Sequence, residues 1–155
     1  HKLVPFGEFL PFRALLPEAL TTPVGSKDFS RGPGPATAHW PGLPAMSPLV
    51  CYEAIFPDLA VNGKDRPKLL LNLTNDAWFG TSSAPYQHFE MSRMRAVEQG
   101  IPLIRVANTG ISAVVDSYGR VKQKLEIDTK GFLDTHIPAE ALTPTFYSKA
   151  GDHIL

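Results

Sequence analysis

Cys51 is the only cysteine among the 155 residues, and it lies where an apolar run turns polar. Leu49 and Val50 predict the end of a buried strand, and the residues from Glu53 onward predict the start of a helix. A thiol at such a turn lies near unpaired backbone N–H groups and the positive end of a helix dipole, which favour the nucleophilic thiolate. From its position alone, Cys51 fits better the alternative of a small buried hydrophobic residue with no role in catalysis. The case for a nucleophile therefore depends on polar motifs elsewhere.

Acyl transfer through a thiol requires a nucleophile, a base, donors for the developing oxyanion and a pocket for the acyl group. Glu8 is a candidate acid, because Pro5 and Gly7 bend an otherwise apolar segment around it. An acid among apolar neighbours is the setting in which enzymes tune a base. A surface glutamate at a turn is an equal alternative.

Two polar motifs follow predicted strands. Residues 75–80, Asn-Asp-Ala-Trp-Phe-Gly, come directly after the apolar run 69–73, and Asn-Thr-Gly at 108–110 follows the next strand. Polar groups at strand ends followed by aromatics are typical of a ligand crevice in an open α/β sheet. Turn formers and core aromatics are the alternative. His88 fits a capping or hydrogen-bonding role better than that of a base, and the five histidines show no metal-ligand spacing.

The periodicity predicts strands that alternate with helices and end in a hairpin, which indicates an α/β layered sandwich with a mixed sheet. Residues 143–155 show no period. The expected strands are one ending at Cys51, one over 69–73, one over 101–107, a hairpin of 111–117 with 120–127, and a weak strand over 132–137. A short helix is expected from the first strand to about Val61, and a longer helix over 86–99. The longer helix should have an apolar stripe of Tyr86, Phe89, Met94 and Val97 and should stop at Gly100.

The region 11–47 is predicted to be a Pro-rich lid or loop. Eight of the 15 prolines fall between positions 11 and 48, with a short helix expected near 15–20. Long loops inside compact domains are usually functional lids or linkers. Phe29, Trp40 and Met46 would give this one apolar anchors, which favours a partly ordered lid.

Composition narrows the function classes. Net charge is zero, with 15 basic and 15 acidic residues, so nucleic acid is a poor partner. One cysteine excludes an internal disulfide and thiolate-rich metal sites. No apolar stretch approaches the roughly 20 residues that span a bilayer. The chain opens on His1 without a methionine, which predicts a piece of a longer protein.

Together these segments resemble the nitrilase-like catalytic domain of the apolipoprotein N-acyltransferase family, within the carbon-nitrogen hydrolase superfamily. The combination of Val-Pro-Phe-Gly-Glu at 4–8, Cys-Tyr-Glu at 51–53 and the 75–80 motif is highly specific. The resemblance covers nearly the whole chain, in the expected order. Its other matching segments are 29–33, 87–89, 93–96, 108–114 and the turn at 118–119.

The resemblance implies a bacterial inner-membrane enzyme with its catalytic domain on the periplasmic side. Cys51 would accept an acyl chain from phospholipid as a thioester and pass it to the amino group of a diacylglyceryl-cysteine at a lipoprotein's N-terminus. Glu8 falls on a second active-site glutamate that supports catalysis. No cofactor, metal or nucleic acid is implied. The residues implied as substrate-binding or supporting are Tyr52, Glu53, Asn75, Trp78 and Phe79.

Two members of that family's Glu-Lys-Cys triad have no counterpart here. The base glutamate would lie on an earlier strand, and the oxyanion lysine would immediately precede His1, so Lys2 is not that lysine. We therefore expect residues 1–155 to be a C-terminal part of a nitrilase-like α-β-β-α sandwich, incomplete at its N-terminal side and inactive alone. Residues 143–155 would lead into a membrane helix.

Two other interpretations stay open at this point. A soluble amidase of the same superfamily would hydrolyse a carbon-nitrogen bond with water where the acyltransferase uses an amine. A non-catalytic binding domain could keep the fold without the triad, because only one triad position is visible.

Overall fold

The computed structural model describes residues 8–15, 17 and 28–152, in two units that divide after Gly34. The first unit contains the 3₁₀ helix η1 (Arg13–Leu15). Asp28 joins its described segments, because one carboxylate oxygen accepts from the Leu10 N–H at 3.1 Å and from Arg13 Nη2 at 2.6 Å. Most of the short helix expected near 15–20 lies outside the described residues.

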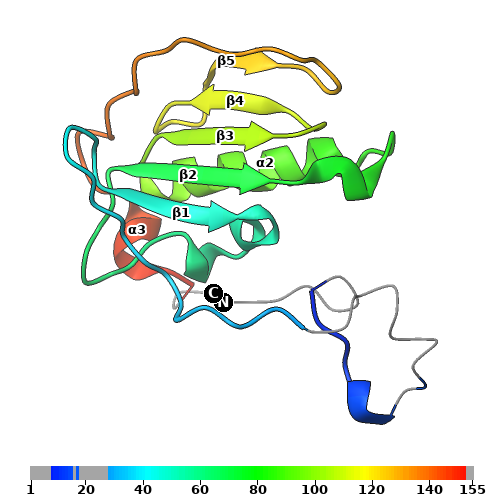
Figure 1. Ribbon diagram of the computed structural model, residues 1–155. Coiled ribbons are helices and arrows are strands. Elements are labelled where there is room, and N and C mark those ends of the chain that lie inside the picture. Colours follow the sequence, from blue (N-terminus) through cyan, green and yellow to red (C-terminus); the bar gives the residue numbers. More distant parts are fainter. Residues whose placement is uncertain (1–7, 16, 18–27, 153–155) are drawn as a thin grey trace. The chain divides into compact units, whose positions relative to one another are not determined.

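The second unit is built on a mixed sheet of five strands, which confirms the predicted α/β class (Figure 1). The first three strands along the chain run parallel to one another, and the last two form the predicted antiparallel hairpin. The spatial order equals the chain order. The strands are β1 (Met46–Val50), β2 (Leu69–Thr74), β3 (Leu103–Ala107), β4 (Ser112–Val115) and β5 (Val121–Leu125).

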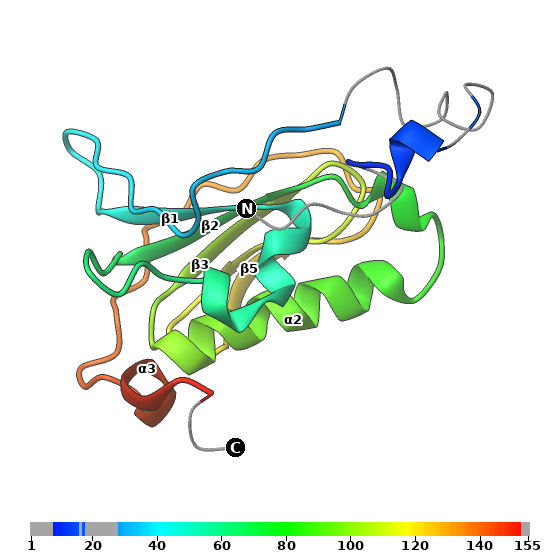
Figure 2. The same cartoon turned by 90° about the horizontal axis from the view of Figure 1, so that it is seen from below.

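Helix α2 (Ala84–Gln99) lies across one face of this sheet (Figure 2). It ends where predicted, because Gly100 adopts the left-handed conformation at φ 64° and its N–H bonds back to the last turn. Apolar side chains of the helix and the sheet form the core between the two layers. The buried core residues are Leu70, Phe89, Ala96, Ile101, Leu103, Ile111, Ala113 and Val115.

The predicted apolar stripe on α2 is wrong except at Phe89. Tyr86, Met94 and Val97 are about half exposed. The helix instead covers polar positions of the sheet and the loop beside it, so polar side chains on its inner face have hydrogen-bonding partners there. The buried face of α2 consists of Pro85, His88, Phe89, Ser92, Arg95, Ala96 and Gln99.

Three other expectations need correction. After β1 the chain forms two short 3₁₀ helices, η3 (Cys51–Ile55) and η4 (Pro57–Leu59), in place of one helix. Residues 132–137 form no strand. The segment with no period contains the helix α3 (Phe146–Ala150), which begins because Thr145 Oγ1 accepts from the Ser148 N–H at 3.0 Å. Five residues are too few to show a helical period.

Side chains alternate between the two faces of each strand, and on the face that packs against α2 some of them are polar. Leu70 and Asn72 point to the α2 side of β2, and their register partners Leu103 and Arg105 do so on β3. Towards the carboxyl ends of the parallel strands, this stripe therefore changes from leucine to asparagine and arginine. A buried polar cluster lies there.

Candidate active site

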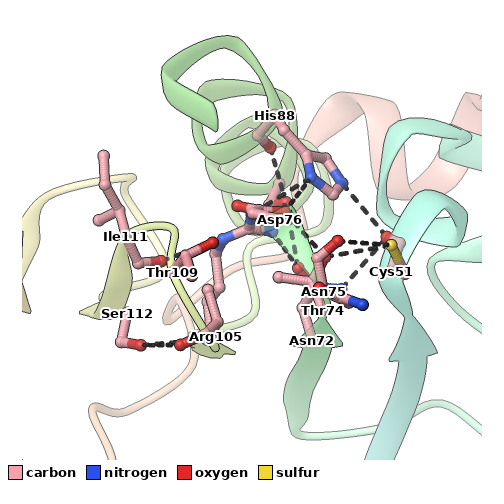
Figure 3. Close-up of polar contacts among 12 residues, drawn as sticks. Cys51, Asn72, Thr74, Asn75, Asp76, His88, Arg105, Thr109, Ile111 and Ser112 are labelled. Atoms are coloured by element: carbon pink, nitrogen blue, oxygen red, sulfur yellow. Dashed lines mark hydrogen bonds and ion pairs between the residues drawn. The ribbon is translucent and has the colours of Figure 1, made fainter. Parts of the chain in front are cut away.

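The carboxyl ends of β1, β2 and β3 meet at one edge of the sheet and bring the two predicted loop motifs together with Cys51. Val50 pairs with Leu73, so the next residues, Cys51 and Thr74, are neighbours. Thr74 Oγ1 lies 3.2 Å from the thiol Sγ (Figure 3). A sulfur at this edge, beside a hydroxyl group and only half-buried, can accept a substrate from solvent.

Cys51 has a strained backbone. It is the first residue of η3, as predicted for a strand-to-helix turn, and its φ is +47°. For a residue with a side chain this left-handed conformation costs roughly 1–2 kcal/mol. Such strain persists only where the surroundings fix it, and it is concentrated at functional sites. Glu53 closes the turn, because its Oε2 accepts from the Val50 N–H at 3.0 Å.

Two buried side chains contact the carbonyl oxygen of Cys51. Asn72 Nδ2 donates to the Leu49 carbonyl at 2.9 Å and lies 3.5 Å from the Cys51 carbonyl. His88 Nε2 lies 3.3 Å from the same Cys51 oxygen. The histidine thus contacts the backbone of Cys51 and does not pair with its sulfur in the manner of a Cys–His base.

Behind the turn lies a buried ion pair. Arg105 Nη2 donates to Asp76 Oδ2 at 2.7 Å, and His88 Nδ1 lies 2.9 Å from Asp76 Oδ1. Arg105 is 1% exposed, Asp76 is 0% exposed and His88 is 4% exposed. Arg105 also donates to Ser92 Oγ at 2.9 Å, to the Ile111 carbonyl at 3.2 Å and to the side-chain oxygen of Asn72.

The electrostatics of this cluster follow from burial and pairing. Burial opposes ionisation of Asp76, but the hydrogen bond from His88 and the charge of Arg105 outweigh it, so the pKa of Asp76 lies below its usual value. Burial lowers the pKa of Arg105, and the charge of Asp76 opposes this change. The aspartate is therefore a carboxylate at neutral pH, with a cation on one side.

The loop after β3 fits closely against Asp76. A Cβ atom on Gly110 would lie 2.0 Å from Asp76 Oδ2, so only glycine leaves room for the carboxylate. Asn108 Oδ1 accepts from the Asp76 N–H at 3.0 Å, and Asn108 Nδ2 donates to Asn75 Oδ1 at 2.6 Å. The two loop motifs that the sequence singled out therefore hold each other.

The predicted aromatic residues occupy different environments. Trp78 is 75% exposed, which excludes the core alternative for this side chain in the described chain. Phe79 is half-buried, and its ring meets the His88 ring edge-on at 5.6 Å. Tyr52 makes a similar contact with Phe56 at 5.2 Å. Of the predicted site residues, Trp78 is thus the aromatic with most surface to offer a ligand.

Glu8 lies in the first unit, which is described separately, so its part in catalysis stays a prediction. Sequence reasoning missed Asn72 and Arg105 and ranked His88 low. The available signal was a single polar residue within each of two apolar strand segments, Leu-Leu-Leu-Asn-Leu and Leu-Ile-Arg-Val-Ala. A polar side chain on a buried strand face requires a partner.

Two further findings concern the described residues only. None of their helices combines the length and the apolar character that crossing a membrane requires. Their histidine, cysteine and acidic side chains form no group of three or more that could hold a metal ion.

Residues 4–147 match the family model described as carbon-nitrogen hydrolase. Curated relatives include the apolipoprotein N-acyltransferase of Rhodopseudomonas palustris, 49% identical over 97% of this chain, and that of Rickettsia prowazekii, 44% identical over 98%. The chain spans 28% and 31% of the length of these two relatives.

Solved structures agree with the fold. A mutant amidase from Nesterenkonia sp. AN1, carrying acrylamide added at its active-site cysteine, is 25% identical with a TM-score of 0.50, and the match covers 65% of this chain and 42% of the amidase. The mixed sheet with its helices therefore corresponds to part of the nitrilase fold. From the extent of the family match, the chain belongs to the carbon-nitrogen hydrolase family.

Proposed function

We propose that this chain carries the nucleophile of an apolipoprotein N-acyltransferase. The observation that carries the proposal is the Cys51 thiol, half-buried at the carboxyl edge of three parallel strands in a strained turn. Relatives of that name, 44–49% identical over nearly the whole chain, support the reaction class. The amidase with a covalent adduct at its active-site cysteine supports a nucleophilic thiol.

The reaction has two acyl-transfer steps. A base takes the proton of the Cys51 thiol, and the thiolate attacks the carbonyl carbon of a phospholipid ester. The bond from that carbon to the glycerol oxygen breaks, and the lysophospholipid leaves with the proton that the base returns to this oxygen. The amino group of a diacylglyceryl-cysteine then attacks the thioester. The carbon–sulfur bond breaks, the thiolate is regenerated, and the amine proton passes to a base.

The other site residues have proposed supporting roles. Trp78 is 75% exposed and would contact the acyl chain, and the neighbouring Phe79 packs its ring against His88. Glu53 stabilises the turn through the Val50 N–H, and Asn75 fixes the adjoining loop through Asn108. Tyr52 and Glu8 complete the predicted set. The proposed phospholipid donor and lipoprotein acceptor go with a proposed location at the periplasmic side of the bacterial inner membrane.

An amidase is the second candidate, because the solved structures similar to this fold are amidases. Both reactions pass through an acylated cysteine, and they differ in whether an amine or water discharges it. The non-catalytic alternative predicts no acylated cysteine at all. The acceptor therefore discriminates the two enzymes, and the intermediate discriminates either one from a binding domain.

The test uses the full gene product with a phospholipid that carries a labelled acyl chain. We expect a hydroxylamine-sensitive adduct on Cys51, detected by mass spectrometry of the peptide, and its transfer to a diacylglyceryl peptide. Cys51→Ser is the matched control, because it changes one atom and should abolish turnover. Discharge by water but not by the peptide would favour the amidase, and wild-type activity of Cys51→Ser would refute a cysteine nucleophile.

A further inference from the structure

We propose that His88, oriented by the Asp76–Arg105 ion pair, is a positioning residue for the Cys51 nucleophile. This inference rests on the proposed function. The contacts form a chain from β3 to the reactive turn: Arg105 binds Asp76 Oδ2, the other carboxylate oxygen contacts His88 Nδ1, and His88 Nε2 contacts the Cys51 carbonyl (Figure 3).

The carboxylate fixes the orientation of the imidazole ring. An imidazole can rotate about its side-chain bonds, and a hydrogen bond at one ring nitrogen decides where the other points. Asp76 is itself held on several sides, by Arg105, by the Thr74 hydroxyl at 3.0 Å, and by the close approach of Gly110. The ring of His88 is therefore directed at one backbone oxygen.

That oxygen belongs to the strained residue. Cys51 has φ +47°, and its carbonyl is contacted from two directions, by Asn72 Nδ2 on β2 and by His88 Nε2 on α2. A trans peptide is planar, with its C=O and N–H on opposite sides. Holding the Cys51 carbonyl on the α2 side therefore directs the Tyr52 N–H the other way and limits how far the sulfur can move.

The proposed role of His88 is to position Cys51 and not to transfer a proton. His88 lies against the carbonyl of Cys51, and Sγ contacts Thr74 Oγ1 and the Asn75 carbonyl. Loss of the imidazole should leave the nucleophile present but misplaced. A misplacement of about 1 Å can cost about 10²-fold in rate. The effect should fall on kcat, with the KM for phospholipid nearly unchanged.

The experiment compares His88→Ala with His88→Gln in the full gene product. The Gln side chain carries an amide N–H that reaches towards the Cys51 carbonyl, whereas Ala offers no donor. We expect His88→Ala to lower kcat for acyl transfer about 10²-fold, and His88→Gln to recover at least about tenfold of that loss. Gln99→Ala is the matched control, because Gln99 is also a buried polar residue of α2 but bonds Arg66 at the helix's other end.

Thermal unfolding of all variants distinguishes a loss of Cys51 positioning from a loss of fold stability. The inference is overturned if His88→Ala keeps wild-type kcat, if His88→Gln is no better than His88→Ala, or if Gln99→Ala loses as much kcat at an equal change in unfolding temperature. Failure of the positioning role can be distinguished from failure of the proposed function. Wild-type protein that never acylates Cys51 refutes that function, whereas normal acylation with an unaffected His88→Ala refutes only the positioning role.

Discussion

Replacing Arg105 by methionine tests whether the buried ion pair holds the sheet edge together. The arginine is 1% exposed and donates to a carboxylate, a hydroxyl, an amide oxygen and a backbone carbonyl. Methionine fills a similar volume without donors. Arg105→Met therefore leaves Asp76 as a buried carboxylate without its cation, and leaves the Ile111 carbonyl without this donor.

The expected cost is large because one partner of a buried pair is removed. Breaking such a pair typically destabilises a protein by about 3–5 kcal/mol. Arg93→Met on α2 is the matched control, since Arg93 pairs with Glu90 at 2.9 Å but the two side chains are 39% and 50% exposed. An exposed pair of this kind contributes about 0.3–0.5 kcal/mol. The two variants make the same chemical change and should differ in cost by about tenfold.

Amide hydrogen exchange of peptides from β2 and β3 measures this cost in the domain itself. In Arg105→Met these amides should exchange about 10²- to 10⁴-fold faster than in the wild type, and in Arg93→Met less than about threefold faster. Adding Asp76→Asn to Arg105→Met should slow the exchange again, because it removes the unpaired charge. Equal exchange in Arg105→Met and Arg93→Met would refute the view that the buried pair stabilises this edge.

Two other perturbations address the same carboxylate. Gly110→Ala should destabilise the fold by about 1–3 kcal/mol, because its Cβ would collide with Asp76 Oδ2. Gly63→Ala, where nothing lies within 4 Å, should change stability by no more than about 0.5 kcal/mol, and equal exchange in the two alanine variants would contradict the close approach. The lowered pKa of Asp76 means that its stabilisation is complete above the ordinary value of about 3.9 and is lost as pH falls through the lower folded value. The unfolding temperature of the wild type should thus fall more steeply than that of Asp76→Asn between about pH 5 and about pH 2, and parallel curves would argue against this assignment.

The sequence predicted the elements whose pattern is local. The apolar run 69–73 and the alternating hairpin are the strands β2, β4 and β5, and Gly100 ends the helix before β3. The failure on α2 has a physical cause. A helix can bury polar side chains where the sheet it packs against offers them hydrogen-bonding partners. Here the sheet offers Asn72 and Arg105, which both bond Ser92 of α2. Polar side chains were therefore buried on α2 while Met94 stayed half exposed.

The candidate site divides in the same way. Cys51 and the 75–80 motif could be found from the sequence, because an unusual residue type at a strand end is visible without knowing the neighbours. His88 could not, because its role depends on Asp76, which it contacts across 12 positions, and on a carbonyl 37 positions away. Backbone groups carry no residue-type signal. A positive φ at Cys51 was equally invisible, since nothing in a cysteine's identity predicts it. The strained turn and the buried residues that contact it are therefore one feature, and only the folded chain shows that Cys51 and the buried ion pair are linked through His88.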